Sequence, residues 1–318
     1  MTRKTYVLLA CLLALSVSSL PAQTILGTIR GTATDPSGAA VPGVSVVVRN
    51  LDTNIETRAT TNASGLYEVT HLIPGRYAVK AEHAGFKTVT VSNILLETSA
   101  TVRADVRLEV GEVTTSVNVE AAAPVVNSES AEVAAVRSND VMVRLPLNAR
   151  NSFYFAMLVL TPGATRGQGS NVSLGGARGF QWHTTVDGTS TRSPLFANAV
   201  GPGESSMEMT GELRIQLAND KAESSLPGGY YATTKSGGNG LHGSLFFFHS
   251  DSRLRARNTF SSSVPFAVDN DYGASAGGPI VKNRTFFFAT WEGFPSRSER
   301  IFNTNVPTVA FRDRKSVV

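Results

Sequence analysis

The chain has 318 residues, of which 42% are hydrophobic and 17% charged, and it carries a net charge of +4 at neutral pH. This length suggests two or three domains. The basic residues are spread along the chain rather than clustered, which argues against a nucleic-acid partner. The only cysteine, Cys11, lies in a segment that we expect to be removed. The mature chain would then have no disulfide, thiolate metal site or cysteine nucleophile.

Residues 1–22 have the three parts of a secretory signal peptide. Arg3 and Lys4 form the charged start, Val7–Leu15 is the apolar run, and small residues precede the expected cleavage before Gln23. We therefore expect Sec export. No later segment reaches the roughly 18 apolar residues of a membrane helix. An exported chain of this kind would have to span a membrane with the strands of a β-barrel.

Residues 23–110 favour a small all-β domain, because runs rich in Val, Ile and Thr alternate with turn residues every 8–12 positions or so. The signature residues are Gly31, Asp35, Gly38, Pro42, Gly43, Gly65, Leu66, Tyr67, Leu72, Pro74, Gly75, Arg76, Tyr77, Gly85 and Phe86. In this order they resemble the carboxypeptidase regulatory-like domain. The resemblance implies a prealbumin-like β-sandwich of the carbohydrate-binding-like fold, without catalytic groups. Tyr67, Tyr77 and Phe86 have two interpretations: sandwich core, or platforms that stack on sugars.

Residues 111–126 change in character to an extended Val/Thr-rich stretch that ends in an Ala/Pro linker. Part of it resembles a TonB box, the segment that periplasmic TonB captures by adding it as a strand to its own sheet. The alternative is the last strand of the sandwich followed by a linker. The box candidates are Glu112, Val113, Thr114, Thr115, Ser116, Val117, Asn118 and Val119.

Residues 127–240 mix helix and strand signals. Ser130–Arg144 is polar and helix-compatible, the apolar run Phe153–Leu160 predicts a buried helix, and Glu212–Asn219 predicts a strand. Asp187-Gly188 is a hairpin signal. A glycine cluster begins at Gly175, but it has neither the GxGxxG pattern nor a following Lys-Ser/Thr, which argues against a phosphate-binding loop.

Residues 241–318 hold aromatic-rich segments. Leu241–Ser250 and Thr285–Phe294 each have the roughly 9–11 residues that a transmembrane β-strand needs, with side chains alternating between two faces. Alternation alone fits equally well with strands of a water-soluble sandwich. The two interpretations stay open at this level.

Taken in order, longer motifs decide between them. They are LPLNARNSF, TPGA, GGARGFQWHTTVDG, ELRIQLANDKAE, ATTKSGGNGLHGSLFFFHS, LRARNTF, GASAGGPIVKNRTFFFATWEG and NVPTVAF. They resemble the Oar-like subgroup of TonB-dependent receptors over nearly the whole mature chain. The resemblance implies a mainly β chain: the sandwich, an α+β plug domain over 127–240, and the first strands of an outer-membrane β-barrel from 241. The plug motif residues are Asn148, Arg150, Asn151, Arg178, Gly179, Asp187 and Gly188.

By the same resemblance the partners are TonB, outer-membrane lipid and an unknown bulky solute, for which an oligosaccharide is one candidate. The expected location is the outer membrane of a Gram-negative-type bacterium. Barrels of this kind have about 22 strands, whereas residues 241–318 supply about three, so we expect a fragment or a truncated gene. The alternative function is an exported sandwich that binds carbohydrate or another surface ligand without transport.

The sequence shows no catalytic constellation. None of its histidines falls in an HExxH or other metal spacing, and there is no GxSxG motif. We therefore expect no enzyme, no metal and no cofactor. The five histidines are His71, His83, His183, His242 and His249.

Overall fold

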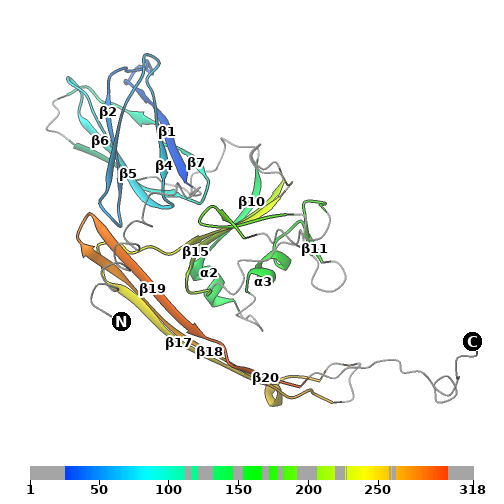
Figure 1. The fold of residues 1–318 in the computed structure, drawn as a ribbon. Helices are drawn as coiled ribbons and strands as arrows, with labels where there is room; N and C mark the ends of the chain where they lie inside the picture. The colour runs from blue at the N-terminus through cyan, green and yellow to red at the C-terminus, as the bar shows by residue number, and fades with distance from the viewer. Residues whose placement is uncertain are drawn as a thin grey trace, which may run out of the picture. The chain divides into compact units, whose positions relative to one another are not determined.

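The computed structural model describes residues 26–111, 116–120, 132–145, 153–166, 172–177, 182–191, 206–218, 226, 228–257, 259 and 263–299. Their contacts divide them into two compact units. One comprises the described residues up to Gly243 together with Ser275–Thr290; the other comprises Ser244–Ala274 together with those from Trp291 onward. The chain is mainly β, as the sequence predicts, with its strands running from β1 in blue to β19 in orange (Figure 1).

The first strands form a β-sandwich. In one sheet β1 pairs antiparallel with β4 and parallel with β7 and β8; the other has the order β3-β2-β5-β6-β9. The bounds are β1 (Gly27–Thr34), β2 (Ser45–Asn50), β3 (Glu56–Thr60), β4 (Leu66–Leu72), β5 (Gly75–Glu82), β6 (Thr88–Leu96), β7 (Thr101–Arg103), β8 (Val106–Arg107) and β9 (Ser116–Glu120).

Both sheets bury alternate side chains in one core, because successive side chains of a strand point to opposite faces. Along β2, Val46 and Val48 are fully buried, and Ile29 of β1 is buried with them. Gly31 marks a close approach of two backbones, since a Cβ there would lie 2.0 Å from the carbonyl oxygen of Ala104. The predicted sandwich is therefore confirmed, with a core dominated by β-branched residues.

A mixed five-stranded sheet follows, with the order β10-β15-β16-β13-β14. β13 and β16 run parallel, and the other neighbours are antiparallel. The bounds are β10 (Val133–Ser138), α2 (Asn139–Arg144), α3 (Phe153–Val159), β11 (Ala164–Arg166), β12 (Val172–Leu174), β13 (His183–Val186), β14 (Thr189–Ser190), β15 (Thr210–Ala218) and β16 (Gly229–Thr234). Met142 of α2, Leu158 of α3 and Ile215 of β15 share a second core.

Within Ser130–Arg144, which the sequence presents as helix-compatible, only the last residues are helical. Val133–Ser138 is a strand that pairs with β15, and the helix begins only at Asn139. The Asn139 side-chain amide donates to the carbonyls of Met207 and Thr210, both at 2.9 Å, where strand gives way to helix. Pairing along a neighbouring strand has overridden a weak local helix preference. The buried helix α3 and the strand β15 lie where the sequence predicts them.

The last described segment is an antiparallel sheet with the order β17-β18-β19, to which β20 adds by pairing with β18. Figure 1 shows β17, β18 and β19 lying side by side as long strands. The bounds are β17 (His242–Asp251), the 3-10 turn η2 (Ser252–Leu254), β18 (Ala267–Val281), β19 (Thr285–Gly293) and β20 (Ser296–Ser298). Asn283, with φ of 61°, makes the short turn between β18 and β19.

One face of this sheet exposes large apolar side chains. Leu245 and Phe247 of β17 are 87% and 66% exposed, and Trp291 of β19 is 62% exposed. On β18, glycines leave room for aromatic rings: a Cβ at Gly273 would lie 2.6 Å from the ring of Phe246. Among the described residues no helix is long and apolar enough to cross a membrane.

Candidate functional site

The candidate TonB box begins outside the described residues and ends in β9. Its first four residues, Glu112–Thr115, are not described, whereas Ser116–Val119 belong to the strand. β9 pairs parallel with β6, from Thr88 opposite Ser116 to Ser92 opposite Glu120. The structure therefore places the second half of the box in the sandwich sheet, which was the alternative that the sequence left open.

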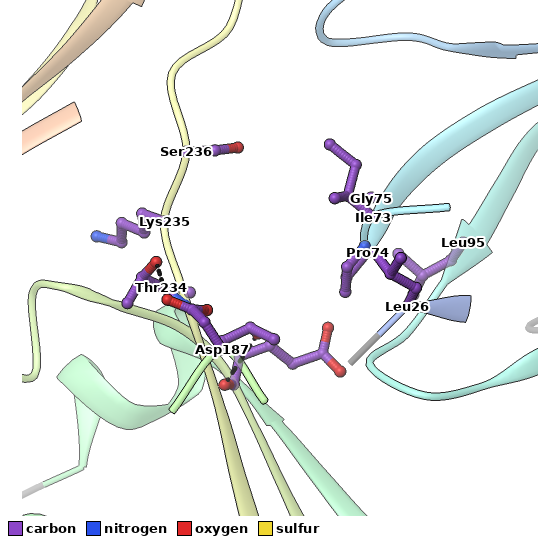
Figure 2. A pocket seen from close by; sticks show the side chains of 12 residues that line it. Leu26, Ile73, Pro74, Gly75, Leu95, Asp187, Thr234, Lys235 and Ser236 are labelled. Carbon is purple, nitrogen blue, oxygen red and sulfur yellow. Dashed lines mark hydrogen bonds between the residues drawn. The ribbon is translucent and has the colours of Figure 1, made fainter. Parts of the chain in front are cut away.

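Asp187 fastens two strands of the mixed sheet. It follows β13 with φ of 48°, a left-handed conformation that Asp tolerates better than most residues, and Gly188 completes the tight turn into β14. Its carboxylate accepts two hydrogen bonds at the end of β16. The Thr234 amide donates to Oδ1 at 2.9 Å and the Thr234 hydroxyl to Oδ2 at 2.8 Å (Figure 2). We call this pair the Asp187 clasp.

A second side-chain contact holds the residue that follows Thr234. The Lys235 ammonium donates to Oε1 of Glu208 at 2.7 Å, and both side chains are largely buried. The same oxygen accepts from the Ser275 hydroxyl of β18 at 3.3 Å. Lys235 thus ties the segment that leads to β17 back to the loop before β15.

A pocket opens beside the clasp. Figure 2 shows the Asp187 carboxylate, Thr234, Lys235 and Ser236 along it. Its lining residues are Leu26, Ile73, Pro74, Gly75, Leu95, Asp187, Gly211, Glu212, Thr233, Thr234, Lys235 and Ser236. The lining combines aliphatic side chains with hydroxyls and two carboxylates.

Glu212 of β15 is mostly buried and accepts a hydrogen bond at 2.7 Å from the Thr98 amide. Burial raises the pKa of this carboxyl above its ordinary value, and the hydrogen bonds from Thr98 oppose that shift. The folded protein therefore holds a proton on Glu212 more tightly than the unfolded chain does.

Arg214 forms a buried ion pair that the sequence did not reveal. Its side chain is 4% exposed and pairs with Glu132, which immediately precedes β10, and its guanidinium also donates to the Gln216 side chain. Leu213, Arg214 and Ile215 are successive residues of one strand, and all three are buried. Because both faces of β15 are covered, the charge requires an internal partner.

The first glycine of the cluster allows a close backbone contact. Gly175 has φ of 55°, and a Cβ there would lie 1.8 Å from the Leu217 carbonyl oxygen. Only a glycine permits this approach of the β12 turn to β15.

The sandwich aromatics belong to its core. Tyr67 is 3% exposed and its hydroxyl donates to the Ala104 carbonyl; Tyr77 is 2% exposed and donates to the Ile73 carbonyl at 2.7 Å. Burial raises the pKa of the Tyr67 hydroxyl far above its usual range. Phe86 packs against the same core. Tyr67 and Tyr77 therefore present no platform for a sugar ring, whereas Phe86 is only partly buried.

Five of the seven expected plug motif residues lie outside the described residues: Asn148, Arg150, Asn151, Arg178 and Gly179. Only Asp187 and Gly188 are placed, and they form the clasp and its turn. Within the described ranges, no three His, Cys, Asp or Glu side chains are grouped so that they could hold a metal ion.

Comparison with known proteins bears on the whole arrangement. Residues 28–109 match the family model of the carboxypeptidase regulatory-like domain, and residues 233–314 match that of an outer membrane beta barrel domain. The TonB-dependent transporter Oar of Myxococcus xanthus is 29% identical to the chain over 284 residues, which cover 82% of this chain and 26% of Oar. The chain is a relative of a TonB-dependent transporter. It spans about a quarter of the length of that relative.

Solved structures resemble this chain only over part of its length. The TIE protein of Bacillus anthracis is 22% identical with a TM-score of 0.23, covering 27% of this chain and 16% of its own. A putative carbohydrate binding protein from Bacteroides uniformis is 18% identical with a TM-score of 0.23, covering 26% of this chain and 40% of its own. Both TM-scores are too low for a shared overall fold.

Proposed function

We propose that this chain forms part of an outer-membrane TonB-dependent transporter that takes up a bulky solute. The observation that carries the proposal is the exposed apolar face of β17 and β19, within the residues that match an outer membrane barrel domain. Leaving Leu245, Phe247 and Trp291 in water would cost roughly 1.5–3 kcal/mol per side chain relative to burial. Lipid removes that cost, and aromatic side chains are typical of the barrel's interfaces with water.

In this proposal each part of the chain has a mechanical role. The sandwich lies in the periplasm, residues 127–240 form the plug that occludes the barrel, and TonB captures Glu112–Val119. Tension on the box would reach the mixed sheet first at Glu132 and β10. β10 is the terminal strand of that sheet, so its ladder with β15 would open one residue pair after another. The Glu132–Arg214 ion pair would resist the first step.

The clasp would limit how far that opening spreads. Asp187 and Lys235 hold the end of β16 and the segment that leads to the barrel strands. A partial exit of the plug could then open a path while the remaining strands stay paired. No residue forms or breaks a covalent bond in this mechanism.

The alternative, an exported sandwich that binds carbohydrate, has less support. Its strongest sugar-stacking candidates, Tyr67 and Tyr77, are buried in the core. An oligosaccharide remains one candidate solute for the transporter.

A proline at Val117 tests the coupling. Proline has no backbone N–H and cannot complete a strand with TonB. In the whole transporter, Val117→Pro should abolish cross-linking to TonB and uptake, while surface labelling shows an assembled barrel. Ala121→Pro, just beyond the box, is the matched control and should retain both activities. Undiminished cross-linking by Val117→Pro would exclude Glu112–Val119 as the box.

A further inference from the structure

We propose that the sandwich is a competing partner of the TonB box: β6 holds Ser116–Glu120 at rest, and TonB must displace β6 to capture the segment. This inference rests on the proposed function. It adds a regulatory role for the sandwich, which otherwise has no active part in the proposed transport mechanism.

The strand order supplies the first argument. β9 is the last strand of the order β3-β2-β5-β6-β9, so one edge of β6 pairs with β5 and the other with the box. Without β9, β6 would present a row of unpaired N–H and C=O groups. The sandwich thus offers the box the same kind of backbone template that TonB offers by strand addition.

The register supplies the second argument, because it matches like with like at every position. Val89 and Val91 stand opposite Val117 and Val119, and both β6 valines are buried. The polar pairs are Thr88 with Ser116, Thr90 with Asn118 and Ser92 with Glu120. A shift by one residue would place every valine opposite a polar residue. The sequence of the box therefore specifies this register with β6, in addition to favouring a strand.

β6 and TonB therefore exclude each other as partners of the box. Strand addition takes its affinity from the backbone edge and its specificity from alternate side chains. TonB would need the segment around Val117 and Val119 that is already in register with β6. The ladder spans only five residue pairs at the end of a sheet, so exchange between partners would be reversible.

A disulfide lock between the two strands tests this competition. Thr90 and Asn118 are Cα partners in the ladder, and neighbouring strands lie about 4.8 Å apart, a separation that a disulfide can bridge. The only native cysteine is Cys11 in the expected signal peptide, so the engineered pair stands alone. The whole transporter carrying Thr90→Cys and Asn118→Cys would be exposed, in outer-membrane preparations, to the purified periplasmic domain of TonB.

The oxidised lock should capture at least about tenfold less TonB than the wild type, and reduction should restore capture. The matched control uses the same β6 position: Lys80→Cys with Thr90→Cys links β5 to β6 and leaves β9 free. That control should capture TonB in both redox states, which separates locking from damage to the sandwich.

Capture by the oxidised lock within twofold of its reduced form would overturn the inference and leave the proposed function standing. That result would mean that TonB adds to the outer edge of β9 while β6 stays paired. Failure of the wild-type transporter to capture TonB at all would overturn the proposed function, and this inference with it.

Discussion

Replacing Asp187 with alanine removes both acceptors of the clasp and places a Cβ without a polar group in a left-handed backbone conformation. Hydrogen bonds to a charged group contribute about 1.5–3 kcal/mol each, and the clasp is half-buried, so we take the lower end for each of its two bonds. The left-handed conformation adds about 1 kcal/mol for alanine. The local opening of the β16 end should therefore become easier by about 4 kcal/mol.

Hydrogen exchange at the Thr234 amide measures this directly, because that N–H donates to Asp187. A change of 4 kcal/mol corresponds to about a thousandfold faster exchange. Asp187→Asn keeps one acceptor oxygen and tolerates the backbone conformation, so it should accelerate exchange only about tenfold. The amide of Tyr230, near the opposite end of the β15–β16 pairing from Thr234, is the internal control and should stay protected.

A double-mutant cycle with Thr234→Ala isolates the coupling between the two residues. If Asp187→Ala leaves exchange at Thr234 unchanged, the clasp does not hold the end of β16. The account of a plug that opens only in part would then lose its structural basis.

Three further changes test other features. Arg214→Met leaves Glu132 buried without its partner and should lower the free energy of unfolding by about 3–5 kcal/mol in detergent. Adding Glu132→Leu should recover much of this loss. If the double variant is no more stable than Arg214→Met, the two charges are not paired. Burial raises the pKa of Glu212 above its ordinary value of 4.5, so its stability contribution is complete below pH 4.5 and is lost as the pH rises through the raised pKa. Glu212→Gln should increase stability at pH 7 and remove that dependence from urea-unfolding curves; a lower stability at pH 7 would refute the sign. Leu245→Arg should destabilise the folded barrel by about 2–4 kcal/mol if this side chain faces lipid, against a near-neutral Leu245→Met; equal midpoints for the two variants would place Leu245 elsewhere.

The sandwich and the barrel strands were predictable from sequence because their patterns are local. Tyr67, Gly75 and their neighbours form a signature of turns and core positions. β17 is shifted by one residue at both ends from the expected strand, and β19 ends one residue earlier than expected. The alternation of side chains and the turn residues occupy consecutive positions, so a strand can be recognised from its own short stretch of sequence.

The features that were missed depend on which segments become neighbours. Arg214 looks like a solvated residue in its own strand, and only the covering of β15 on both faces makes it a buried charge. Val133–Ser138 looks helix-compatible until β15 offers it an edge to pair with. The pairing of β9 with β6 likewise joins residues about 28 positions apart, and such register matches emerge only when both strands are known.

In the proposed transporter, the length of β18 has a consequence for the cell surface. Its 15 residues, at about 3.3 Å each, reach about 50 Å, or about 38 Å along the membrane normal at a tilt near 40°. The apolar band of an outer-membrane barrel is only about 25 Å tall. The turn at Asn283 is short, as periplasmic turns are, so the excess would rise outward, where β20 pairs with Ala267–Asp269. Antibodies or phages that bind such a cell would then contact the paired strands β18 and β20 first.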